Sequence, residues 1–379
     1  MTASEYDSVR PPEPAGRRRR GGKGGRGARP GGPDGARPGG ADGARPRGAD
    51  GAREAAMVPE AQFTSYYGRP VVKAVPWGPG IAAYLFLGGV AGGSAVLAAG
   101  AQLSGRLTLQ RNCRLAALGA VGVGAVALVE DLGRPERFLN MLRVIKLTSP
   151  MSLGSWILSV FSTGASVAAA AEVDRMTGER LPLGPLRRVL RLVEGPAGLE
   201  AAAFGPLLAV YTAVLLADTS TPTWNHARDE LPFVFVSSAS LASAGLAMIT
   251  TPAAESAPAR RLAVLGVIGD LAATQVMRRR MDPVVAETLH DGRPGALLRL
   301  SEALAVAGGI GTLLGGRRRG AAAASGLALL AASALTRFGI FEAGIRSAKD
   351  PRYTIEPQKR RLAARRAAGV TDDSITTAG

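Results

Sequence analysis

Histidine and cysteine, the usual ligands of haem and metal clusters, are almost absent from this sequence. Its 379 residues include two histidines, His226 and His290, and one cysteine, Cys113. A haem b inside a membrane needs histidine ligands within the spanning helices, and both histidines lie in polar connectors between apolar segments. One cysteine can form neither a disulfide bond nor a cysteine-ligated zinc or iron–sulfur site by itself. We therefore predict no haem, no metal and no iron–sulfur cluster in this chain.

A few charged residues lie deep inside apolar segments, where a buried charge is costly unless it is paired or lines a polar cavity. Asp270 and Glu302 fall in adjacent segments, and Arg337 falls in a third. These three residues could form buried ion pairs or a hydrated path for protons. Other acids lie at segment ends, where an interfacial charge is the ordinary interpretation: Glu130, Asp131, Asp218 and Glu342.

Three polar segments that contain aromatic residues are expected at one face of the membrane: VPWGPGIAAY, EDLGRPERFLN and YTAVLLADTSTPTWN. A quinone headgroup needs donors for two carbonyl groups, an aromatic or apolar slot and a nearby source of protons. An alternative stays open, because Tyr and Trp at span ends also serve simply to anchor helices in the headgroup zone. The residues of these segments that could bind a quinone are Trp77, Tyr84, Asp131, Arg134, Tyr211, Trp224 and Asn225.

The elements that would position these residues are membrane-spanning helices. From Ile81 onward, apolar runs approach the roughly 20 residues needed to cross a bilayer, and short charged connectors separate them. Gly88, Gly89, Gly92 and Gly93 form two overlapping GxxxG spacings, which let helices approach closely in lipid. We predict an all-α integral membrane protein, a compact bundle with both termini on one side, and eight spans at 81–103, 113–130, 152–171, 198–217, 232–250, 261–277, 297–315 and 320–341.

Both ends of the chain differ in composition from the membrane domain, which we place at 73–346. Residues 1–72 include an Arg/Gly/Pro-rich octapeptide repeat at 27–53, which has too few apolar side chains to form a core, so we predict a disordered tail. Residues 347–379 form a basic C-terminal tail. The net charge of +16 could suggest nucleic acid, but its place in the tail and at segment ends fits membrane topology better, and we expect no nucleic-acid partner.

The connector charges hardly indicate the orientation in the membrane, because the numbers of Lys and Arg residues on the two sides are nearly equal. Arg114 and Arg191, for example, count as connector charges on the side away from the termini. An Arg-rich N-terminal segment is costly to translocate without a signal sequence. We therefore expect a multi-pass protein of the plasma membrane with cytoplasmic termini.

The chain resembles the NrfD/polysulfide-reductase membrane-subunit family over roughly residues 75–345, in the segments WGPGIAAYLFLGGVAGGSAVLA, EDLGRPERFLNMLRVIKLTSPMSLGSWIL and YTAVLLADTSTPTWNHARDELPFVFVSSA. The combination of DLGRPERF, SPMSLGSW and a P-x-WN segment is specific. This resemblance implies a haem-free subunit of eight helices in two four-helix bundles that exchanges electrons with menaquinone or another quinone. It also implies two partners, a ferredoxin-like four-cluster iron–sulfur subunit and a molybdopterin catalytic subunit.

Some site residues can be carried over from the resemblance. Tyr211 matches a tyrosine upstream of the P-x-WN segment, whereas Tyr84 stands where some members have a histidine. Asp131 and Arg134, in DLGRP, would shape the entrance of the quinone pocket or relay protons. The basic N-terminal tail has no counterpart in the family.

Two other functions remain open. A proton- or cation-coupled secondary transporter would use Asp270 and Glu302, but the inverted repeat that would favour it is not evident within the spans. A structural anchor that binds no quinone is the second. We predict a quinone-interacting membrane anchor of an oxidoreductase complex, whose primary catalytic centre lies in a partner subunit.

Overall fold

The computed structural model describes residues 69–131 and 136–369, and all regular elements in this part of the chain are helices. The predicted disordered tail lies almost entirely outside the described residues. Eight long helices are present in the described part: α1 (Pro79–Leu103), α2 (Leu107–Asp131), α4 (Pro150–Met176), α5 (Leu186–Ala217), α7 (Leu231–Thr250), α8 (Ala257–Arg280), α10 (Gly292–Gly315) and α11 (Arg319–Lys349). The shorter helices there are α3 (Glu136–Met141), α6 (Pro222–His226), α9 (Pro283–His290) and α12 (Arg352–Ala367).

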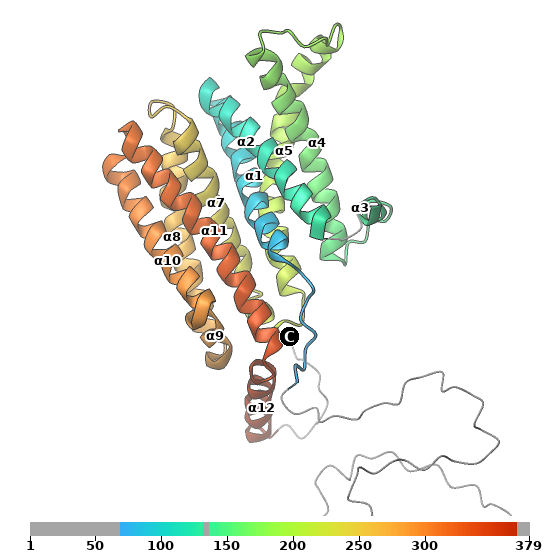
Figure 1. Ribbon diagram of the computed structural model, residues 1–379, viewed down its shortest axis with the longest axis vertical. Helices are drawn as coiled ribbons and strands as arrows, with labels where there is room; N and C mark the ends of the chain where they lie inside the picture. Colours follow the sequence, from blue (N-terminus) through green and yellow to red (C-terminus); the bar gives the residue numbers. More distant parts are fainter. Residues whose placement is uncertain (1–68, 132–135, 370–379) are drawn as a thin grey trace, which may run out of the picture. The chain divides into compact units, whose positions relative to one another are not determined.

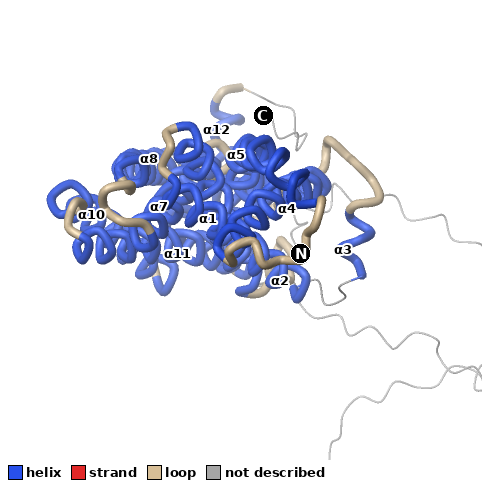
Figure 2. Tube along the Cα trace, turned by 90° about the horizontal axis from the view of Figure 1, so that it is seen from above, coloured by secondary structure: helices blue, strands red, loops and turns tan. Residues whose placement is uncertain are grey.

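The long helices form two four-helix bundles, as the resemblance implied (Figure 1). Helices α1, α2, α4 and α5 make up the first bundle, and α7, α8, α10 and α11 make up the second. The bundles meet where α1 and α5 pack against α7 and where α1 also touches α11. Figure 2 shows the helices from above, with α3 standing outside the first bundle.

Seven of the helices in the described residues are long and apolar enough to cross a membrane, which makes the chain an integral membrane protein. Helix α8 is the exception, although the sequence predicted a span at 261–277. Its ends carry Arg260, Arg261 and Arg278–Arg280, and its middle carries Asp270, so its composition is too polar. It packs against α7 and α10 as the fourth helix of the second bundle.

Several helices extend beyond their predicted spans, among them α2 and α5 at their starts, where charged side chains lie within the helices. Helix α2 begins at 107 rather than 113, and α5 begins at 186 rather than 198. Arg114 of α2 forms an ion pair of 2.9 Å with Glu172 of α4, and Asp174 of α4 accepts hydrogen bonds from two arginines near the start of α5. A paired charge is tolerated inside a membrane protein, so charged residues that suggested connectors lie within helices. The interpretation of Arg114 and Arg191 as connector charges is therefore wrong.

Small residues set the spacing between α1 and its neighbours, as the GxxxG pattern predicted. A Cβ atom at Gly92 would lie 2.3 Å from the carbonyl oxygen of Gly205 in α5, and one at Gly205 would lie 2.5 Å from the carbonyl oxygen of Gly92. A Cβ atom at Gly93 would lie 2.3 Å from the hydroxyl of Ser243 in α7. Only glycine allows the backbones of α1 and α5 to come so close at Gly92 and Gly205. Gly88 has no such neighbour within 4 Å.

The connector between α7 and α8 caps the start of α2. The Glu255 carboxylate accepts hydrogen bonds from the Thr108 N–H at 2.9 Å, the Thr108 hydroxyl at 2.7 Å and the Leu109 N–H at 3.2 Å. The N–H groups of a first helical turn have no partner within the helix, so this contact satisfies two of them. The hydrogen bond from the Thr108 hydroxyl, with the two backbone bonds, lowers the pKa of Glu255. The connector thus fastens the second bundle to the first.

Helix α12 marks the opposite end of the bundles, which we call the α12 end (Figure 1). Helix α11 continues to Lys349, and α12 follows it beyond the ends of the spans, so the predicted C-terminal tail at 347–379 contains a helix. Helices α1 and α4 begin at the α12 end, and α2 and α5 end there.

Candidate functional site

A cavity lies at the α12 end of the first bundle, with about 80 Å³ of space for the centres of water molecules. Four of the residues predicted to bind a quinone line it: Trp77, Tyr84, Asp131 and Tyr211. Its wall is otherwise mostly apolar and is made by Ile81, Leu128, Met141, Met151, Ser155, Leu158 and Leu215. A mostly apolar cavity with a few convergent polar groups is typical of a small-molecule site.

Two tyrosines from different helices meet in this cavity. The hydroxyl groups of Tyr84 in α1 and Tyr211 in α5 form a hydrogen bond. The Tyr211 ring lies over Gly154 of α4, where a Cβ atom would be 2.1 Å from a ring carbon. In a pair of phenols one hydroxyl donates and the other accepts, so the accepting phenol keeps its own proton for another acceptor. The pair can therefore donate a hydrogen bond to a carbonyl group in the cavity.

Asp131 joins the end of α2 to the start of α1. Its Oδ1 atom accepts a hydrogen bond of 2.9 Å from the backbone N–H of Gly78, directly before α1 begins. Asp131 is the last residue of α2, one of the helices long and apolar enough to cross a membrane, and it also lines the cavity. Asp131 is thus placed to exchange protons between a ligand and water.

Trp77 forms an aromatic side of the cavity and is supported from the second bundle. It stacks on Trp224, with ring centroids 6.0 Å apart and an angle of 23° between the planes. The Trp224 indole N–H donates a hydrogen bond of 2.9 Å to the carbonyl oxygen of Ile340, and its ring fills the space above Gly344, where a Cβ atom would be 2.0 Å away. Trp224 therefore positions Trp77 and does not itself line the cavity.

Of the two remaining predicted quinone-site residues, one lies away from this cavity and the other lies outside the described residues. Asn225 is exposed on the connector after α5, and its amide donates hydrogen bonds of 3.3 Å to the carbonyl oxygens of Ala217 and Thr219. It closes the connector and does not reach the cavity. Arg134 lies outside the described residues.

Asp270, Glu302 and Arg337 lie in the second bundle but do not form one ion-paired group. Glu302 pairs with Arg278 at 2.6 Å. Arg337 is completely buried and donates a hydrogen bond of 2.6 Å to the backbone carbonyl oxygen of Phe235. The central carbon of its guanidinium group lies 3.7 Å from the centre of the Phe235 ring. Within the described residues, Asp270 Oδ1 and Arg337 Nε and Nη1 are buried without a hydrogen-bond partner.

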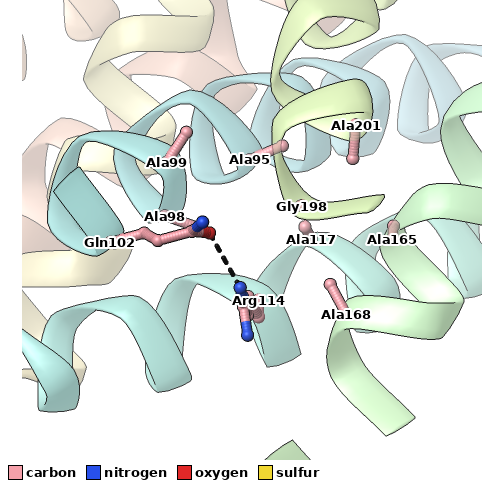
Figure 3. Close-up of a pocket in the computed structure, with 10 residues that line it drawn as sticks. All are labelled: Ala95, Ala98, Ala99, Gln102, Arg114, Ala117, Ala165, Ala168, Gly198 and Ala201. Carbon is pink, nitrogen blue, oxygen red and sulfur yellow. Dashed lines mark hydrogen bonds between the residues drawn. The ribbon is translucent and has the colours of Figure 1, made fainter. Parts of the chain in front are cut away.

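Sequence reasoning missed two features of the first bundle. It left Ser155, Met141 and Met151 out of the cavity, although the SPMSLGSW segment after Pro150 could have suggested that the start of α4 lies at this end. It also missed a second, much smaller cavity of about 10 Å³, beside the buried Arg114, with a wall made largely of alanine (Figure 3). That space holds about one water molecule.

The second cavity is part of a charged cluster at the end away from α12. Arg114 donates hydrogen bonds to Glu172 at 2.9 Å and to Gln102 at 2.8 Å, the second of which is drawn in Figure 3. Arg175 contacts both Glu172 and Glu194. The carboxylates and guanidinium groups neutralise one another, so the cluster ties α1, α2, α4 and α5 together.

The described residues contain no cluster of three or more His, Cys, Asp or Glu side chains placed to hold a metal ion. His226 ends α6 and His290 ends α9, both outside the long helices. Burial lowers the pKa of His226, and the nearby Arg361 acts in the same direction. The buried Cys113 is a free thiol.

Comparison with known families agrees with this architecture. Residues 71–281 match the sequence family described as "Polysulphide reductase, NrfD". The match covers more than half of the 379 residues. The match runs from just before α1 to the residue after α8 and includes all the helices that line the larger cavity. No curated protein matches the chain.

Proposed function

The chain belongs to the polysulphide reductase NrfD family, and we propose that it is the quinone-interacting membrane subunit of an oxidoreductase complex. The observation that carries this proposal is the cavity at the α12 end, where two phenols, a carboxylate and an indole from distant parts of the sequence come together. These groups can supply the hydrogen-bond donors, the aromatic slot and the proton source that a quinone headgroup needs. The cavity also lies at the end of the spans, where a ligand dissolved in the bilayer can reach it.

The residues of the cavity have separate tasks in this proposal. The Tyr84–Tyr211 pair donates a hydrogen bond to one carbonyl oxygen of the headgroup, and Trp77 packs against the face of the ring. Asp131 takes up or supplies protons at the aqueous boundary. Oxidation of a quinol releases two electrons and two protons, and reduction of a quinone consumes the same number, so a proton-exchanging group beside the ring serves either direction.

The electrons need an acceptor or donor outside this chain. We propose a ferredoxin-like four-cluster iron–sulfur subunit, with a molybdopterin subunit beyond it, docked at the α12 end. Exposed cations on α12, among them Lys359, Arg361 and Arg366, lie at that end and would favour a partner with an acidic surface. In the orientation proposed here, cytoplasmic termini in the plasma membrane, this partner is cytoplasmic.

A second proposal concerns protons in the second bundle. Asp270 and Arg337 are buried with unpartnered polar atoms, and Glu302 acts on Asp270 electrostatically while paired with Arg278. Such groups support a hydrated proton path. Asp270→Asn should abolish any proton transfer across proteoliposomes and leave quinone binding intact, and proton flux without a quinone would instead favour a secondary transporter.

Photolabelling tests the quinone site directly. The full-length chain in lipid nanodiscs would be irradiated with an azido-quinone and digested, and the labelled peptides identified by mass spectrometry. We expect labels on the starts of α1 and α4 and the end of α5, and competition by unlabelled quinone. Labelling confined to other surfaces, or unaffected by competitor, would refute the site.

A further inference from the structure

The loop between α3 and α4 exposes large apolar side chains next to the cavity. Val144 is 66% exposed, Ile145 60% and Leu147 75%. Arg143 and Lys146 are interspersed with them and are also exposed. Three such side chains in a polar connector would be unfavourable in water, whereas apolar groups with neighbouring cations are typical of segments that lie in a membrane interface.

The loop is held in this position by the start of α4. The hydroxyl of Ser152 accepts a hydrogen bond of 3.0 Å from the Lys146 N–H and donates one of 3.0 Å to the Val144 carbonyl oxygen. Ser149 caps the same helix, because its side chain accepts a hydrogen bond from the Ser152 N–H. The exposed apolar side chains are therefore fixed to a helix that itself spans the membrane.

The loop also borders the larger cavity. Met141, which precedes the loop, and Met151, which follows it, both line the cavity. Met151 is 49% exposed, so the cavity wall reaches the surface of the protein at this residue. Figures 1 and 2 show α3 and the following loop beside the first bundle rather than between the bundles, on a side where α4 faces outward.

We propose that residues 143–151 form a membrane-immersed loop at the lipid side of the cavity, and that the cavity takes a long-tailed ligand from the bilayer, with the tail leaving past Met151. The occupant of the exposed apolar face is the acyl layer of the membrane. The apolar side chains of the loop continue the apolar surface of α4, while Arg143 and Lys146 of the same loop reach the headgroups. The part about the tail rests on the quinone function proposed above, and the part about the loop does not.

The physical reason for a tail exit is the size and lining of the cavity. Its 80 Å³ of space, bounded by side chains from α1, α2, α4 and α5, suits a headgroup and leaves no room for an extended isoprenoid chain. A tail that stays in lipid keeps its apolar environment and loses little freedom. Methionine side chains are flexible and apolar, and so can adapt to a chain that passes between them.

Probe accessibility tests the immersion of the loop. A nitroxide would be attached to Leu147→Cys in the full-length chain in nanodiscs, and its collisions with oxygen and with a water-soluble nickel chelate compared. The native Cys113 is buried, and the unsubstituted chain controls for its labelling. Leu313→Cys on α10, where the native side chain is 69% exposed, serves as the lipid reference, and Arg228→Cys in the α6–α7 connector serves as the water reference. We expect the label at 147 to match the lipid reference, and a match to the water reference would overturn the proposal.

Calorimetric binding tests the tail exit. Dissociation constants would be measured for a naphthoquinone with an isoprenoid tail and for the same ring without one. In Met151→Trp, a larger side chain obstructs the exit, and we expect the ratio of the two constants, tailed to tail-less, to rise by about tenfold. Leu313→Trp, on α10 of the second bundle and away from the cavity, should leave this ratio unchanged.

The outcomes separate the two proposals. An unchanged ratio in Met151→Trp would show that the tail leaves elsewhere and would overturn the exit. Binding of neither quinone by the unsubstituted chain would refute the quinone function and the tail exit together, while the position of the nitroxide would still decide whether the loop lies in lipid.

Discussion

The hydrogen-bonded pair of Tyr84 and Tyr211 leads to the sharpest prediction for the site. Tyr211→Phe keeps the ring that packs over Gly154 and removes only the hydroxyl, so the shape of the cavity is preserved. A hydrogen bond contributes about 0.5–1.5 kcal/mol, which corresponds to a loss of roughly twofold to tenfold in quinone-linked turnover. The activity of the partner subunits with a soluble electron carrier should stay unchanged, because the carrier does not use this cavity.

A double substitution distinguishes a functional pair from two independent contacts. If the two hydroxyl groups act as one donor, Tyr84→Phe/Tyr211→Phe should lose little more turnover than either single variant. Tyr353→Phe is the matched control, because Tyr353 is also buried at the α12 end but lies in α12, outside the cavity. Full quinone-linked turnover in an assembled Tyr211→Phe complex would show that the phenol is only a packing residue.

Three further predictions concern packing and charge. Gly154→Ala should weaken quinone binding without loss of assembly, because the added Cβ atom would displace the ring of Tyr211. Gly119→Ala is the control and should be neutral in the same binding assay, because no other atom lies within 4 Å of the added Cβ atom. Arg114→Met should destabilise the protein by about 1–3 kcal/mol, measured by thermal unfolding in detergent, because it removes one of the two arginines paired with the buried Glu172 and leaves only the half-exposed Arg175. Glu255→Ala should lower stability by about 1 kcal/mol at pH 7 through loss of a helix cap. Since the native hydrogen bonds lower the pKa of Glu255, this contribution is present above the unfolded-state pKa and lost as the pH falls through the folded-state pKa.

Each of these predictions has a result that contradicts it. Equal effects of the two glycine substitutions would mean that the contact with the phenol ring does not matter. An Arg114→Met protein as stable as the wild type would show that Arg175, which already pairs with Glu172 at 3.1 Å, is enough to neutralise this carboxylate. A stability difference between wild type and Glu255→Ala that does not shrink as the pH falls through the folded-state pKa of Glu255 would contradict the capping role.

The sequence predicted the helices well because apolar length determines them almost alone. It predicted their ends less well. The start of α5 was placed at 198, although pairs such as Arg191 with Asp174 allow charged residues to lie inside a helix of the bundle. Such pairs depend on which helices become neighbours, and one sequence does not contain that information in its hydropathy.

The candidate site shows the same division. Trp77, Tyr84, Asp131 and Tyr211 could be grouped in advance because each lies near the end of a span at the same face, and the structure brings all four to one cavity. Trp224 also lies near the end of a span at this face, and yet it packs behind Trp77 and does not line the cavity. The difference is set by the glycine space above residue 344 in α11, which accepts the indole and holds it away from the cavity.

This support from α11 shows why the site needs both bundles. The family match ends at residue 281, before α9 begins, and the cavity itself is lined by the first bundle. Trp77 nevertheless stacks on Trp224, whose ring also faces Phe341 at 5.7 Å and whose N–H is bound by Ile340. The aromatic side of the cavity therefore takes its position from a helix that lies beyond the matched region. A displacement of α11 would move Trp77 through these contacts, so the second bundle sets the geometry of a site to which it contributes no lining residue.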